Sequence, residues 1–196
     1  MRRTLPISVL SSIMAATMVA GCSSPAPAPE ATTTPAAPAA PVTPAEVTDG
    51  VGVDKLPFDA LPAVARTDQV ACPYLDTEWV AETNGQRVTG YGIDERFSTP
   101  SCVFYSFPEE PQLTVIVREM DSVAEATQVV DWAAPIDSTE PAEEPAGWSG
   151  GRGGGQGNGA LYAVAKDNTA VVVFSNQEQS LKAQLVAEEV IQNLGL

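Results

Sequence analysis

A proline-rich segment near the N-terminus limits how much of this chain can fold. Residues 23–48 contain seven prolines, eight alanines and five threonines, and they contain no aromatic residue. Such a segment cannot bury enough apolar surface to offset the entropy lost on ordering, so we expect it to stay solvated. Its prolines favour the polyproline conformation, which rises about 3.1 Å per residue and gives a semi-rigid tether of at most roughly 80 Å. A single domain is therefore expected only after this region, over residues 66–196.

The tether region as a whole is assigned to residues 22–65, and two further interpretations apply to it. Its last part, residues 51–65, contains prolines but also apolar residues, and it is expected to pack on the domain as a strap. The mixture of threonine, serine, proline and alanine before it is typical of O-glycosylated stalks. A proline-binding partner is less favoured, because no basic residue flanks the prolines.

A lone cysteine lies between this tether and an apolar run. Two arginines precede a mostly apolar stretch from Leu5 to Ala20, which is too short for a stable membrane span but has the pattern of a secretory signal. Residues 1–21 are thus expected to be the signal peptide of a lipoprotein. An ordinary secretory signal followed by a stray cysteine is the alternative. The sequence Val19-Ala20-Gly21-Cys22 resembles the lipobox of bacterial lipoproteins. That resemblance implies that Cys22 carries acyl chains and anchors the chain to the outer face of the plasma membrane.

The charge and composition exclude several classes of function. The chain has 25 acidic and ten basic residues and no histidine. Cleavage before Cys22 would leave eight basic residues and a formal net charge of −17, which argues against nucleic acid or anionic lipid as partners. Without histidine, neither a Ser-His-Asp nor a Cys-His triad can form. We therefore expect no enzymatic activity, no cofactor and no metal site.

The two remaining cysteines are expected to form a structural disulfide. Once Cys22 is assigned to lipid, Cys72 and Cys102 are an even pair in an exported protein. Their bond would close a loop of 31 residues and stabilise the domain by roughly 3–4 kcal/mol. A metal or redox pair is the alternative, but partner ligands and the close C-x-x-C spacing are missing.

Local signals predict a short helix and a weak strand at the start of the domain. Asp76 is placed to cap a helix, with Leu75 and Val80 at the two positions of a hydrophobic staple. The pair Asn84-Gly85 is expected to end that helix with a left-handed residue. Residues 87–92 then indicate a weak strand whose two glycines suggest a bulge or bend.

Two similar ββα units follow. The expected hairpins are residues 102–107 with 113–120, joined by a Pro-Glu-Glu-Pro turn, and residues 160–166 with 169–175, joined by Asp-Asn. Each is followed by a capping box, Ser122-x-x-Glu125 and then Ser175-x-x-Glu178. The apolar stripes expected on the two helices are Val123, Thr127, Val130 and Ala134, then Ala183, Val186, Ala187, Val190 and Leu194. The predicted fold is α+β, an antiparallel sheet with both helices packed on one face.

Several short motifs resemble a known group of proteins. They are the lipobox, the Pro/Ala/Thr tether, Cys72-Pro73-Tyr74-Leu75, Ser101-Cys102-Val103-Phe104, Asp131-Trp132-Ala133-Ala134-Pro135 and Gly147-Trp148-Ser149-Gly150-Gly151-Arg152. Together they resemble the small, disulfide-bearing lipoproteins of actinobacteria, and among these a family of unknown function. The resemblance covers most of the mature chain and implies no activity or catalytic residues.

A glycine-rich stretch, residues 147–159, is the most suggestive place for a site. It lacks the lysine and hydroxyl of a P-loop and precedes a strand, so a phosphate site is not expected. We expect a flexible connector or a ligand-contacting loop, with exposed Trp148 and Arg152 as a candidate interaction surface and Trp132 as a competitor. The acidic side chains of Asp137, Glu140, Glu143 and Glu144 lack EF-hand spacing, so a solvated loop is favoured over a calcium site.

Three classes of function are compatible with these observations. The first is a non-catalytic docking or assembly factor for a cell-envelope or respiratory membrane complex, which suits the tether and the missing catalytic groups. The second is a carrier for lipid or glycolipid, which needs a cavity of several hundred cubic ångströms between sheet and helices. The third is a carboxylate-dependent hydrolase of cell-wall sugar, which needs two acids facing one cleft.

The anchor at Cys22 can be tested directly. Cys22→Ala removes the only thiol at the predicted lipidation position, so the variant should incorporate no labelled fatty acid and should remain unprocessed or escape into the medium. Metabolic labelling followed by cell fractionation measures both effects. Full lipid incorporation in the variant would contradict the assignment.

Overall fold

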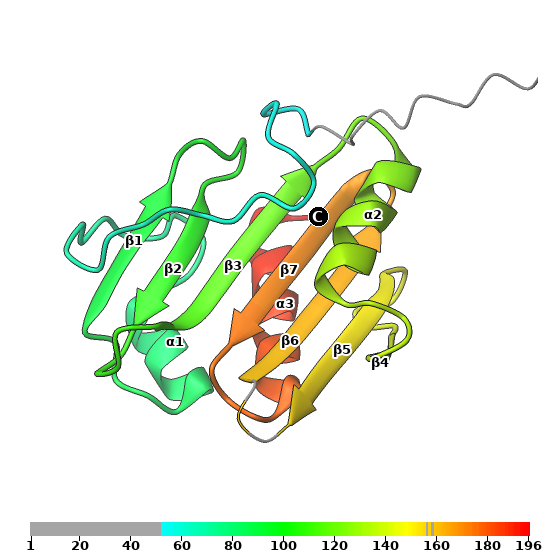
Figure 1. Ribbon diagram of the computed structural model, residues 1–196. Helices are drawn as coiled ribbons and strands as arrows, with labels where there is room; N and C mark the ends of the chain where they lie inside the picture. Colours follow the sequence, from blue (N-terminus) through cyan, green and yellow to red (C-terminus); the bar gives the residue numbers. More distant parts are fainter. Residues whose placement is uncertain (1–51, 156, 158) are drawn as a thin grey trace, which may run out of the picture. The chain divides into compact units, whose positions relative to one another are not determined.

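The computed structural model describes residues 52–155, 157 and 159–196, so the predictions for Cys22 and for most of the tether lie outside the described residues. Within these residues the chain forms a seven-stranded antiparallel sheet with three helices packed against it (Figure 1). The sheet order is β1-β2-β3-β7-β6-β5-β4. The predicted α+β class is confirmed. The helices are α1 (Thr77–Asn84), α2 (Val123–Ala133) and α3 (Ser180–Leu194), and the strands are β1 (Gly90–Asp94), β2 (Ser101–Tyr105), β3 (Pro111–Glu119), β4 (Glu140–Ala142), β5 (Ser149–Gly155), β6 (Gly159–Lys166) and β7 (Thr169–Ser175).

The helices cover both faces of the sheet, which corrects the prediction of a single face. Helices α1 and α3 lie behind the sheet in Figure 1, and α2 lies in front. Alternate residues of β3 and β7 pack in two different apolar clusters. The cluster with α3 contains Val115, Val117, Val171 and Val173, and the cluster with α2 contains Ile116 and Val172. Because neighbouring residues of a strand point to opposite faces, a continuous apolar run needs cover on both sides. The continuous apolar runs of β3 and β7, Val-Ile-Val and Val-Val-Val, indicate strands that are buried on both faces.

Three of the predicted helix ends are confirmed and one is wrong. The Asp76 side chain accepts hydrogen bonds from the first turn of α1, Gly85 ends it in the left-handed region at φ 71°, and Ser122 accepts from the backbone N–H of Glu125. Ser175 is no cap, because it ends β7 and its hydroxyl donates to Asn84 Oδ1, 2.8 Å away. Helix α3 begins five residues later, at Ser180.

The apolar stripe of α3 is confirmed, while that of α2 is shifted. In α3, Ala183, Val186, Ala187 and Val190 are buried, and Leu194 packs at the edge of the same cluster. The residues of α2 that face the core are Ala126, Val129, Val130 and Ala133. Val123 is 61% exposed and Thr127 is exposed, so the expected stripe describes the edge of the buried face.

Most of the glycine-rich stretch, Ser149–Gly155, is the β-strand β5, which corrects its assignment as a loop. Strand β5 pairs with β4 on one side and β6 on the other. A side chain at Gly151 would meet Ala134 Cβ at 2.8 Å, and one at Gly150 would meet Val130 Cγ1 at 2.9 Å. On the other face, a side chain at Gly154 would clash with the carbonyl of Glu178. The glycines therefore allow α2 and the β7–α3 loop to approach the strand closely.

The predicted disulfide is present and joins two buried positions. Cys72, just before α1, is bonded to Cys102 in β2, with Cα atoms 5.6 Å apart. Tyr74 donates a hydrogen bond from its hydroxyl to the Pro100 carbonyl oxygen at 2.8 Å, beside the bridge. The bond thus fastens the start of α1 to an interior strand of the sheet.

Residues 52–68, here called the strap, cross the α2 face of the sheet from β3 towards β1 (Figure 1). Gly52 forms a bridge with Met120, and the buried guanidinium of Arg118 lies 3.3 Å from Asp54 and donates to the carbonyl oxygens of Leu56 and Pro57. The predicted strap is therefore confirmed for residues 52–65, which pack on the domain although they precede the expected boundary at residue 66.

Two features hold the far end of the strap against β1. The Asp94 carboxylate accepts a hydrogen bond from the backbone N–H of Ala63 at 2.8 Å, and it forms an ion pair with the Arg96 guanidinium at 2.6 Å. Gly92 leaves room for Val64, whose Cγ1 would lie 2.5 Å from an added Cβ. The glycines of the weak strand thus serve close packing of the strap.

Trp148 should behave as a core residue. Its side chain is 4% exposed and belongs to the cluster beneath α3. Trp148→Ala should therefore lower the free energy of unfolding by about 3–5 kcal/mol, as expected for a truncated buried aromatic. Chemical denaturation measures this. A loss below about 1 kcal/mol would contradict the burial.

Asp94 should make stability depend on acidic pH. Hydrogen bonds from Arg96, and from the Ala63 amide, outweigh burial and hold the pKa of Asp94 at about 2, below its ordinary value of 3.8. The carboxylate therefore stabilises the fold above pH 3.8, and this contribution is lost as the pH falls towards 2. Asp94→Asn should be less stable than the parent at pH 7, with the difference vanishing near pH 2. Denaturation at several pH values measures it, and exposed Asp137→Asn is the matched control.

Candidate functional site

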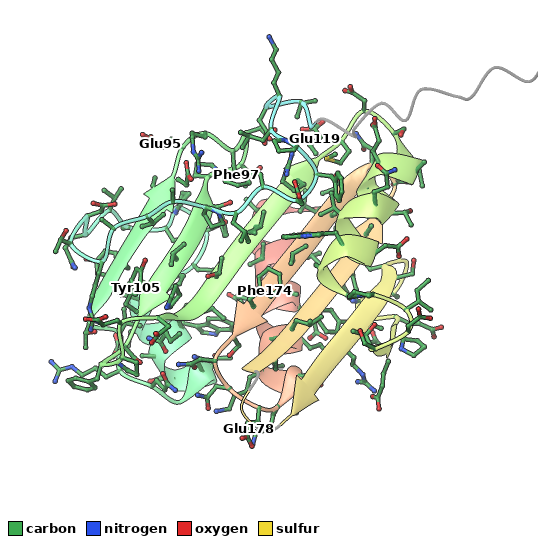
Figure 2. All side chains as sticks on the ribbon, in the orientation of Figure 1. Glu95, Phe97, Tyr105, Glu119, Phe174 and Glu178 are labelled. Carbon is green, nitrogen blue, oxygen red and sulfur yellow. A yellow bond between two sulfur atoms is a disulfide. The ribbon has the colours of Figure 1, made fainter. Side chains whose placement is uncertain are left out.

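A groove of about 730 Å³ lies on the α2 face of the sheet, between the strap and α2. Helix α2 contacts mainly β5, β6 and β7, while the strap lies across β1, β2 and the end of β3, so part of this face between them stays uncovered. Figure 2 shows Tyr105 and Phe174 on this part of the face and Glu178 at its lower end. We call this surface the aromatic groove.

The floor of the aromatic groove is made by alternate residues of three neighbouring strands. Val103 and Tyr105 come from β2, Thr114 from β3 and Phe174 from β7. Trp132 of α2 stands against Phe174 in an edge-to-face arrangement, with ring centroids 6.1 Å apart. Such pairs are favourable beyond the area that they bury. The rings therefore form a defined apolar surface in a partly open site.

Tyr105 is fixed in this surface by its own hydroxyl. The phenol donates to the carbonyl oxygen of Val64 in the strap, 2.8 Å away, and the Arg66 guanidinium lies 5.9 Å from the ring centroid. Burial, together with the charge of Asp68, raises the pKa of the phenol, so it stays protonated and keeps donating. The small part of Tyr105 that lines the groove therefore belongs to a side chain whose polar atom is already engaged.

The rim of the aromatic groove is apolar on one side and acidic at one end. Leu61, 58% exposed, and Pro62 form the wall contributed by the strap. The charged side chains among the lining residues are those of Glu110 and Glu178, and both are exposed. The groove can therefore offer apolar contacts from its floor and wall, and its two glutamates can attract a positively charged ligand.

The predicted interaction residues do not form one surface. Trp132 lines the aromatic groove, but Trp148 is buried in the cluster beneath α3, with the amine of Lys166 5.8 Å from its ring centroid. Arg152 lies on β5, paired with Glu140 at 3.6 Å. The expectation of an exposed Trp148 is therefore wrong, because the chain before β5 turns the indole into the core.

Sequence reasoning missed the residues that form the groove. The sequence placed its floor residues in strands but did not indicate which face of the sheet they occupy. These residues are Val103, Tyr105, Thr114 and Phe174. Their signal is alternation, since each has at least one neighbour in its strand that packs on the α3 side. Which face stays partly open cannot be read from any one strand.

A second, smaller hollow of about 370 Å³ lies on the other flank of α2. Val123, Thr127, Val130 and Ala134 line it, together with the glycines of β5. Val123 and Thr127 of the stripe expected from sequence therefore border this hollow with exposed side chains, whereas Val130 and Ala134 are buried and also belong to the core. Ile136 at its edge is 80% exposed.

Two further findings concern metal binding and membrane spans in the described residues. No group of three or more Cys, Asp or Glu side chains among them is placed to hold a metal ion. Within the same residues, no helix combines the length and apolar character needed to cross a membrane. The aromatic groove is taken as the candidate site because it brings the side chains of Tyr105, Trp132 and Phe174 together.

Comparison with known proteins identifies the family. Residues 56–196 match a family described as a domain of unknown function, DUF2020. The match covers more than two thirds of the chain, and it begins inside the strap, so the strap's second part belongs to the family domain. None of the curated proteins with which the chain was compared matches it. The chain therefore belongs to the DUF2020 family.

Proposed function

We propose that this protein is a lipid-anchored, extracytoplasmic docking module that holds a segment of a cell-envelope or respiratory membrane protein in the aromatic groove. The observation that carries the proposal is the cluster of Tyr105, Trp132 and Phe174 in one partly open groove. Aromatic side chains are enriched in the centres of protein interfaces, where they supply large contact areas. The module itself catalyses no reaction.

The N-terminal part of the chain supports this role. A lipidated Cys22 followed by the Pro/Ala/Thr-rich tether would hold the domain within roughly 80 Å of the membrane surface. Confinement near the membrane raises the effective concentration of the domain towards partners anchored in the same membrane, so a modest affinity suffices. The disulfide between Cys72 and Cys102 is typical of a domain that works in an oxidising compartment.

A lipid carrier is the second candidate, and the apolar floor of the groove favours it. A carrier needs a cavity between sheet and helices. On the α3 face, Val186 and Val190 pack with the strands in one buried cluster, which does not favour such a cavity there. A hydrolase is less supported, since Glu110 and Glu178 are exposed, whereas a general acid is normally desolvated.

Site-specific photo-crosslinking in intact cells tests the docking function. A photoreactive residue in place of Leu61, in the groove wall, should give a discrete adduct with one envelope protein. The same residue in place of Leu185, 43% exposed on α3, is the matched control and should give none. Equal adducts at both positions would contradict the groove as the docking surface, and adducts with lipid alone would favour the carrier.

A further inference from the structure

The geometry points to one kind of occupant for the aromatic groove: an extended protein segment with apolar side chains, proline or leucine, flanked by lysine or arginine. This inference rests on the proposed docking function and specifies the chemistry of the partner. It is argued from the pairing of the strands, the state of the aromatic rings and the charges of the rim.

Strand addition does not hold the occupant. The three strands that form the floor are interior strands: β2 pairs with β1 and β3, β3 pairs with β2 and β7, and β7 pairs with β3 and β6. Their backbone groups are therefore used within the sheet, and among the described residues no free sheet edge opens into the groove. Affinity must come from side-chain contacts, in contrast to partners that extend a sheet.

The floor selects apolar side chains. Phe174 and Trp132 are half-buried and present ring surface, and Tyr105, which is 8% exposed, adds a small part of its side chain to the floor. Since the Tyr105 hydroxyl already donates to Val64, the ring offers apolar area without an unsatisfied polar group. Proline-rich segments suit such surfaces, because they are already extended and pack their rings on aromatic side chains.

The rim selects positive charge. Glu110 and Glu178 are the charged residues among those that line the groove, and Arg66 beside it is engaged with the carbonyl oxygens of Ser106 and Pro108. The whole chain carries a net charge of −15, which steers basic segments towards it and opposes acidic ones.

The same charges argue against the chain's own tether as the occupant. Residues 23–48 have the prolines that the floor would accept, but they contain Glu30 and Glu46 and no lysine or arginine. An anionic lipid surface is disfavoured for the same reason. The geometry therefore favours a basic, proline- or leucine-rich segment of another protein.

Binding of two matched peptides to the full-length protein in detergent tests the inference. The first probe is a short proline–leucine repeat ended by two arginines, and the second carries two glutamates instead. The arginine probe should bind at least about fivefold more tightly at low salt, and the preference should shrink as salt is raised. Backbone NMR shifts should cluster at Tyr105, Thr114 and Phe174.

Charge variants locate the preference. Glu110→Gln with Glu178→Gln should remove most of the preference for the arginine probe. Asp137→Asn with Glu143→Gln is the matched control, because it removes the same charge from exposed residues that do not line the groove and should keep the preference. Thermal midpoints of both double variants should equal that of the parent, since all four side chains are exposed.

The outcomes separate this inference from the proposed function. Equal affinity for the two probes, no binding of either, or loss of the preference in the control variant would each overturn the assigned chemistry. If a crosslink at the position of Leu61 still forms in cells, docking stands and only the nature of the segment is wrong. If that crosslink is also absent, the docking function itself fails.

Discussion

The central strands β3 and β7 are apolar on both faces, and the rest of the fold follows from this constraint. Val115 and Val117 point to one side and Ile116 to the other, and Val171, Val172 and Val173 repeat the pattern. Helices α1 and α3 cover the first side. The second side is shared between α2 and the strap, which together leave part of it open. The aromatic groove is the remainder of a face that two separate elements cover incompletely.

The strap stays on this face because a buried charge requires it. Arg118 is fully buried, and burial lowers the pKa of its guanidinium, while Asp54 favours the charged form. The guanidinium also faces the ring of Phe97 at 5.5 Å. A buried charge without partners is strongly unfavourable, so the carbonyl oxygens of Leu56 and Pro57 and the Asp54 carboxylate hold the strap in place. One wall of the groove is thereby fixed to a central strand.

Close backbone contacts explain why this small domain uses so many glycines. Those of β5 allow α2 to pack on a sheet strand, and those of β1 allow the strap to cross it. The strap follows the tether in the chain and forms a wall of the groove, so the proposed lipid anchor and the proposed docking surface are joined by one continuous segment. This arrangement suits a domain that binds at a limited distance from the membrane.

Local interactions allowed much of the fold to be predicted from sequence alone. The cap at Asp76, the left-handed Gly85, the Asp167-Asn168 turn and the hairpin strands depend on residues close in sequence. The disulfide followed from the number of cysteines and the expected compartment. Those features need no knowledge of the tertiary arrangement.

The sequence by itself therefore determined the disulfide, the start of α1 and of α2, and the paired strands of the two hairpins. Only the tertiary structure decided which face each helix covers, that β5 is a strand, and that Trp148 is buried while Trp132 lines a groove. The physical reason is that burial depends on what packs above a residue. A strand with two apolar faces accepts cover on either side, and a glycine run becomes a strand only where a neighbouring helix and strand approach it closely.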